Sequence, residues 1–87
     1  YIDAMITLAK VLADTARLPM AVEMARKAVE LAPTNANALS NLGTYLADTE
    51  DHAGAIDAYS RALQADPAFA SARTNRGLAR LVCGQLA

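Results

Sequence analysis

Residues 36–67 read ANALSNLGTYLADTEDHAGAIDAYSRALQADP, and this stretch decides the fold. In its first half, Leu39, Leu42 and Leu46 recur at intervals of three and four residues, which is the spacing of one face of an α-helix. The same half keeps Gly43 in its interior, where glycine costs about 1 kcal/mol relative to alanine. The stretch therefore predicts two helices joined by a turn, with a glycine that needs a structural reason.

The sequence repeats itself when it is shifted by the distance that separates Pro33 from Pro67. Further identical residues then meet along the chain: Leu8 and Leu42, Leu12 and Leu46, Ala21 and Ala55, Ala28 and Ala62, Asn41 and Asn75, Gly43 and Gly77. Identity at one fixed period is the signature of a solenoid, in which each repeat stacks on its neighbours. The chain therefore holds two full units and the beginning of a third.

Each unit divides into two helices. We predict helices over 2–15, 19–32, 36–49, 55–66 and 70–84. Pro19 favours a helix start, because proline in the first turn loses no hydrogen bond. The segment EDHAG, with His52, reads as an exposed turn, and CGQLA at the end reads as the start of the next such turn. No segment shows the alternation typical of strands.

Composition excludes several classes of function. A net charge of −1 gives no field that would attract nucleic acid, and no apolar run is long enough to insert into a membrane. The single cysteine, Cys83, fits a reducing compartment, so we expect a cytoplasmic protein. His52 has no ligand partner at metal-binding spacing, and no nucleophile or phosphate-binding motif is present. We therefore expect no enzyme activity, no metal and no cofactor.

The repeat resembles the tetratricopeptide repeat family, which places large, small and aromatic residues at fixed positions of its repeating unit. The second unit carries the pattern in Leu39, Leu42, Gly43, Leu46, Ala55, Tyr59, Ala62 and Pro67. The first unit carries it in Met5, Leu8, Ala9, Leu12, Ala21, Ala25, Ala28 and Pro33. The resemblance implies one all-α array of about five helices, paired antiparallel in a right-handed superhelix, with repeats at about 2–35 and 36–69 and a partial one at 70–87. It also implies that Gly43 lets its helix approach its neighbours closely.

The same resemblance implies a concave groove lined by the first helix of each repeat. The polar groove residues that it implies are Thr7, Lys10, Asn37, Ser40, Asn41, Thr44 and Asn75. Asn41 and Asn75 share one position in successive repeats, where peptide-binding members of the family use asparagine to pair with a peptide backbone. The alternative is that both are solvated polar residues on an exposed helix face. Apolar groove residues, Ile6, Leu78 and Leu81, would then set specificity.

Some members of the family instead hold a terminal carboxylate with paired cations and asparagines. The corresponding residues here are Ile6, Lys10, Asn41, Ser71 and Asn75, of which only Asn41 matches. Without those cations the groove lacks the charge-assisted bonds that hold a carboxylate. We therefore do not expect this mode of recognition.

The third unit departs from the pattern, because Arg73, Arg76 and Arg80 occupy positions that are normally apolar. We interpret this stripe as a polar capping face, or as long stems packed on a neighbouring element, in preference to an anion site. An apolar strip, Leu78, Leu81 and Val82, lies on the same predicted helix. A following helix, a downstream domain or a second copy of the chain could cover that strip.

The sequence thus predicts a non-catalytic interaction scaffold that binds a protein or peptide segment in its groove. One alternative is the substrate-recruiting arm of a larger enzyme, similar to glycosyltransferases or sulfotransferases with such repeats. Another is a self-assembling array that uses the C-terminal helix. The chain begins with Tyr1 and not with methionine, so we expect a fragment of a longer protein.

Overall fold

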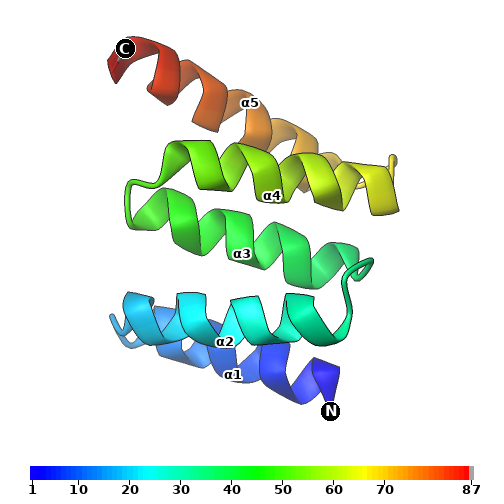
Figure 1. The fold of residues 1–87 in the computed structure, drawn as a ribbon. Coiled ribbons are helices and arrows are strands. Elements are labelled where there is room, and N and C mark those ends of the chain that lie inside the picture. The colour runs from blue at the N-terminus through cyan, green and yellow to red at the C-terminus, as the bar shows by residue number, and fades with distance from the viewer. Residues whose placement is uncertain (87) are drawn as a thin grey trace.

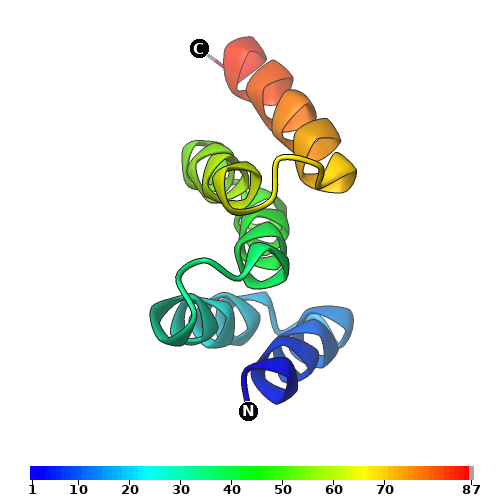
Figure 2. The same cartoon turned by 90° about the vertical axis from the view of Figure 1, so that its right-hand side faces the viewer.

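The computed structural model describes residues 1–86, with side chains as far as Gly84, and residues 1–86 contain helices and no strand. The helices are α1 (Ile2–Asp14), α2 (Leu18–Leu31), α3 (Ala36–Asp48), α4 (His52–Ala65) and α5 (Ala70–Leu86). They stack in chain order and run alternately in opposite directions (Figure 1). Viewed from the side, α1, α3 and α5 form one layer, and α2 and α4 form the other (Figure 2). The all-α solenoid predicted from the sequence is confirmed.

Side chains just before α3 and α4 fix where these helices begin. The N–H of Ala38 donates to the side-chain oxygen of Asn35 over 3.1 Å, and the N–H of Gly54 donates to that of Asp51 over 3.0 Å. Each bond satisfies a backbone donor that has no partner within its own helix. Pro19 lies in the first turn of α2, as the sequence predicts.

The predicted exposed turn EDHAG is wrong in its second half. Because Asp51 caps the helix, α4 already begins at His52 instead of Ala55. His52 is therefore a half-buried helical residue and not an exposed turn residue. This change brings its imidazole against the packed layer.

The turns inside the two complete repeats share an unusual backbone conformation. Ala16 has a φ of 62° and Glu50 a φ of 68°, and these residues stand at the same position of successive repeats. The residue after each turn closes it with a 2.8 Å backbone bond, from the Arg17 N–H to the Leu12 carbonyl and from the Asp51 N–H to the Leu46 carbonyl. This is the Schellman geometry that usually employs glycine.

Gly84 stands at the same repeat position in the third unit, yet α5 continues through it as far as Leu86. The prediction that CGQLA begins a turn is therefore wrong over the described residues. No glycine among the described residues has a positive φ, so Gly84 keeps helical geometry and the helix propagates past the place where α1 and α3 end.

Small residues form most of the core, which lets the helices approach closely. Ala21, Ala55, Ala62 and Ala72 are fully buried, and Leu39 is the largest side chain with less than 2% exposure. Each helix packs on the next, and α3 also touches both α1 and α5 within its own layer. The layer of α1, α3 and α5 thereby forms a continuous surface that can carry a site.

Candidate functional site

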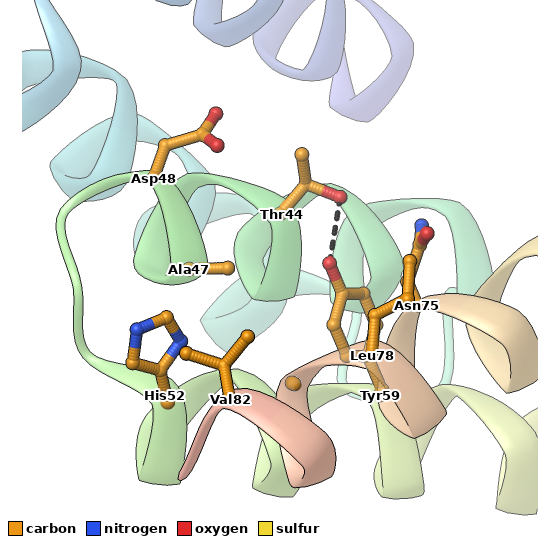
Figure 3. Close-up of a pocket in the computed structure, with 9 residues that line it drawn as sticks. Thr44, Ala47, Asp48, His52, Tyr59, Asn75, Leu78 and Val82 are labelled. Atoms are coloured by element: carbon orange, nitrogen blue, oxygen red, sulfur yellow. Dashed lines mark hydrogen bonds between the residues drawn. The ribbon is translucent and has the colours of Figure 1, made fainter. Parts of the chain in front are cut away.

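An open cavity lies where α3, α4 and α5 meet (Figure 3). Its volume is about 220 Å³. Its walls mix small apolar groups with a few polar ones, from Thr44, Ala47, Asp48, His52, Tyr59, Asn75, Leu78, Ala79 and Val82. An apolar hollow with a few convergent polar groups is the usual form of a binding site.

Two hydroxyl groups in the wall are bonded to each other. The oxygens of Thr44 and Tyr59 lie 3.0 Å apart (Figure 3), and Thr44 also donates to the carbonyl of Ser40 over 3.2 Å. A carbonyl can only accept, so Thr44 is the donor in its bond with Ser40, whereas either hydroxyl can be the donor in the bond between Thr44 and Tyr59. Each of the two hydroxyl groups therefore already has a hydrogen-bond partner within the wall.

One carboxylate, that of Asp48, stands at the edge of the cavity (Figure 3). Among the described residues, no lysine or arginine lines the wall, while Asp48 contributes a carboxylate. Burial raises the pKa of Tyr59, the bond with Thr44 lowers it, and the carboxylate of Asp48 raises it further, so that the pKa lies above its usual value. The cavity therefore favours a neutral or cationic hydrogen-bond donor over an anion.

His52 is a wall residue that the sequence reasoning missed. Its Nδ1 atom is buried and has no hydrogen-bond partner among the described residues. An unsatisfied buried polar atom costs about 1–3 kcal/mol. The capping residue Asp51, which stands directly before His52, was the sequence signal that could have placed His52 in the helix.

The predicted groove residues do not all reach the cavity. Thr44 and Asn75 line it, whereas Asn41 is half-buried elsewhere on α3. Three others are exposed on α1 and α3, namely Thr7, Lys10 and Asn37. Ser40 is only 6% exposed, so its carbonyl serves Thr44 while its side chain offers little surface. A role of these residues in peptide binding stays a prediction.

The apolar strip of the third unit divides between two environments. Leu78 and Val82 line the cavity, although Leu78 remains 57% exposed. Leu81 is 60% exposed and does not line the cavity. The strip therefore combines part of a binding hollow with one leucine on the open surface.

The arginine stripe of α5 bonds partly to the chain itself. Arg73 donates to the carbonyl of Pro67 over 2.6 Å, and Arg76 donates to the hydroxyl of Ser60 over 3.4 Å. Arg76 is half-buried, whereas Arg80 is exposed. The interpretation of this stripe as a capping face stays a prediction.

The described residues contain no group of three or more histidine, cysteine, aspartate or glutamate side chains that could hold a metal ion. None of the helices in this part of the chain is both long enough and apolar enough to cross a membrane.

Antiparallel helix pairs that recur at one fixed period and stack in two layers define a helical-repeat protein. The tetratricopeptide repeat family matches residues 6–70, and the chain belongs to this family. No curated protein matches the sequence.

Solved structures share the fold at low sequence identity. The second tetratricopeptide repeat domain of Spaghetti (RPAP3), bound to the HSP90 peptide SRMEEVD, is similar with a TM-score of 0.92 and 18% identity, over 98% of this chain and 79% of that one. The C-terminal repeat domain of a putative FK506-binding protein from Plasmodium falciparum gives 0.88 and 20%, over 98% of this chain and 56% of that one. These likenesses establish the fold.

Proposed function

We propose that this chain is a protein-interaction module that binds a peptide segment along the layer of α1, α3 and α5. The observation that carries the proposal is the cavity between α3 and α5, because groove residues predicted from the sequence, Thr44 and Asn75, stand in its wall. The peptide bound to the similar domain of Spaghetti supports the same use of the fold.

Backbone recognition would come from the asparagine pair. Asn41 and Asn75 are both half-buried and lie on adjacent helices of the same layer, α3 and α5. Each amide offers two donors and one acceptor, which match the recurring amides of an extended peptide. Half-burial limits the side-chain freedom that each asparagine would lose on binding.

A random-peptide display selection against residues 1–87 tests the proposal. We expect enriched peptides whose affinity, measured by fluorescence polarisation, falls at least about tenfold in the Asn41→Ala/Asn75→Ala double variant. Gln64→Ala, at an exposed position of α4 in the other layer, is the control. Failure to select any peptide, or equal affinity in the double variant and the control, would overturn the proposal.

Self-association is a second candidate, because both ends of the array expose large apolar side chains. Leu8 and Val11 on α1 are 46% and 51% exposed, and Leu81 on α5 is 60% exposed. Contact between opposite ends would be heterologous and would build open arrays. Light scattering over a concentration series tests it: a rising mass that Leu81→Ser abolishes supports self-association, and a constant monomer mass refutes it.

A further inference from the structure

The cavity has an alanine in its wall where the preceding repeat has a tyrosine ring. Ala79 follows Tyr45 by one full repeat, so the two occupy the same position on α5 and α3. Tyr45 is buried, with 6% exposure, whereas Ala79 lines the cavity with a methyl group. The space on the α3 side of Ala79 corresponds to the space between α1 and α3 that belongs to Tyr45.

The surroundings of Tyr45 show what this space accommodates. Burial raises the pKa of the Tyr45 hydroxyl, and the carboxylates of Asp14 and then Asp48 raise it further. The pKa of the Tyr45 phenol therefore lies above its usual value, chiefly because the ring is buried and also because of the nearby charges. Asp14 stands one full repeat before Asp48, which lines the empty cavity.

The walls of the empty cavity differ from the surroundings of Tyr45 at several positions. Where the earlier site has Thr44 and Asp48, the cavity has the apolar Leu78 and Val82. The ring of Tyr59 stands in the wall where the earlier repeat has the smaller Ala25, so it narrows the space but offers a face for a second ring, and two aromatic rings attract each other beyond the area that they bury. The hydroxyl groups of Thr44 and Tyr59 are bonded to each other, and Asp48 contributes a carboxylate that can only accept.

We propose that this cavity receives a tyrosine side chain of the bound peptide, which stacks against Tyr59 and donates its hydroxyl proton to Asp48. The inference rests on the proposed function, since it names the anchor residue of the groove's ligand. A phenylalanine has no hydroxyl group that could donate to Asp48. An acidic side chain would be repelled by the negative charge of Asp48.

The probe for this inference is p-cresol, which is the side chain of tyrosine as a free molecule. It is titrated into ¹⁵N-labelled protein, with toluene and n-butylamine as mimics of phenylalanine and lysine. We expect saturable amide shifts at Asp48, Leu78 and Ala79 with p-cresol, weaker ones with toluene and none with n-butylamine. Stronger saturable shifts with n-butylamine or toluene would overturn the assignment.

Two variants locate the effect. Ala79→Tyr copies the earlier repeat and fills the space from within, so it should abolish the response to p-cresol while leaving the other amide signals dispersed. Asp48→Asn should weaken binding of p-cresol at least about fivefold and leave toluene unchanged, and Asp14→Asn is the matched control, one repeat away. A p-cresol response that survives Ala79→Tyr, or that Asp48→Asn and Asp14→Asn change equally, would refute the inference.

The outcomes separate this inference from the proposed function. If selected peptides need Asn41 and Asn75 while p-cresol gives no saturable shifts, the tyrosine site is wrong and the groove function stands. If p-cresol binds as expected while no peptide is selected, the cavity takes a phenol and the peptide-binding proposal fails.

Discussion

A Cβ atom added to Gly43 would lie 2.7 Å from Cε1 of Tyr59 and 2.8 Å from its Cδ1. Real side chains do not approach so closely, so α3 and α4 can pack at this spacing only because residue 43 is glycine. The first repeat solves the same problem with two small residues, Ala9 and Ala25, both of which are buried. This contact is the structural reason for a glycine inside a helix.

Gly43→Ala should therefore destabilise the fold by about 1–3 kcal/mol, the usual cost of overpacking a core. Gly77→Ala is the matched control, because a Cβ on Gly77 meets no atom within 4 Å. Because alanine loses less backbone entropy on folding than glycine, Gly77→Ala should raise the free energy of unfolding by up to about 1 kcal/mol. Urea unfolding followed by circular dichroism measures both. Equal effects of the two substitutions would show that Tyr59 does not impose the glycine.

The double variant Gly43→Ala/Tyr59→Ala should lose less stability than the sum of its single changes. It recreates the small-on-small pairing of Ala9 and Ala25, so the overpacking disappears with the ring. We expect a coupling free energy of about 0.5–3 kcal/mol from the double-mutant cycle. If the two single changes in the free energy of unfolding simply add in the double variant, residues 43 and 59 are not in steric conflict.

Glycine at the left-handed turns should stabilise the array. Ala16 and Glu50 adopt positive φ, which costs a non-glycine residue about 1–2 kcal/mol. Ala16→Gly and Glu50→Gly should each gain roughly 0.5–1 kcal/mol, after the extra freedom of glycine in the unfolded chain is deducted. Lys27→Gly, at an exposed position inside α2, should instead lose about 1 kcal/mol. A loss at all three positions would rule out strain at the turns.

Alkaline pH should weaken the fold through the two buried tyrosines. Burial is the largest cause that raises the pKa values of Tyr45 and Tyr59 above 10.0. The stability that the two neutral tyrosines contribute is therefore fully present below their pKa in the unfolded chain, near 10. It is lost as the pH rises through their higher pKa values in the folded protein. Tyr45→Phe should flatten the decline in the free energy of unfolding above pH 10. A decline as steep as in the unchanged protein would exclude Tyr45 as a cause.

The peptide SRMEEVD, which binds the similar domain of Spaghetti, should not bind this groove. Ile6 and Ser71 stand where a carboxylate-holding groove needs lysines, and Asp48 adds negative charge to the cavity. When labelled SRMEEVD is titrated with the protein, its fluorescence polarisation should show no saturable change. The Lys10→Ala variant should give the same result. Saturable binding would mean that cations outside these positions hold the carboxylates.

The repeat period by itself predicts most of the fold. That period, the prolines and the recurring leucines predicted five helices, and the resemblance to the family predicted a close approach at Gly43. The left-handed turns were not predictable, because neither Ala16 nor Glu50 is a residue type that marks such a turn. The start of α4 was predictable from the cap at Asp51, but the turn-like composition of EDHAG obscures that signal.

The candidate site was harder to predict, because it lies where a large side chain of one repeat is replaced by a small one in the next. The exchange of Tyr45 for Ala79 is visible when the repeats are aligned, yet a sequence does not show whether another side chain fills the space. The structure shows that a cavity remains there, with His52 and Tyr59 from α4 in its wall. Groove positions taken one helix at a time could not include these two residues.

A repeat array can thus acquire a pocket when one repeat loses a large side chain that another repeat keeps. Each position has a counterpart in the neighbouring repeat, so the loss of a large ring in one repeat can leave space where the other repeat is filled. The cavity beside Ala79 stands where the preceding repeat has Tyr45, and it is lined by Tyr59 where that repeat has Ala25. Replacing a large side chain by a small one in a single repeat, while the equivalent residue of the next repeat is kept, offers a general way to create recognition sites in proteins of this architecture.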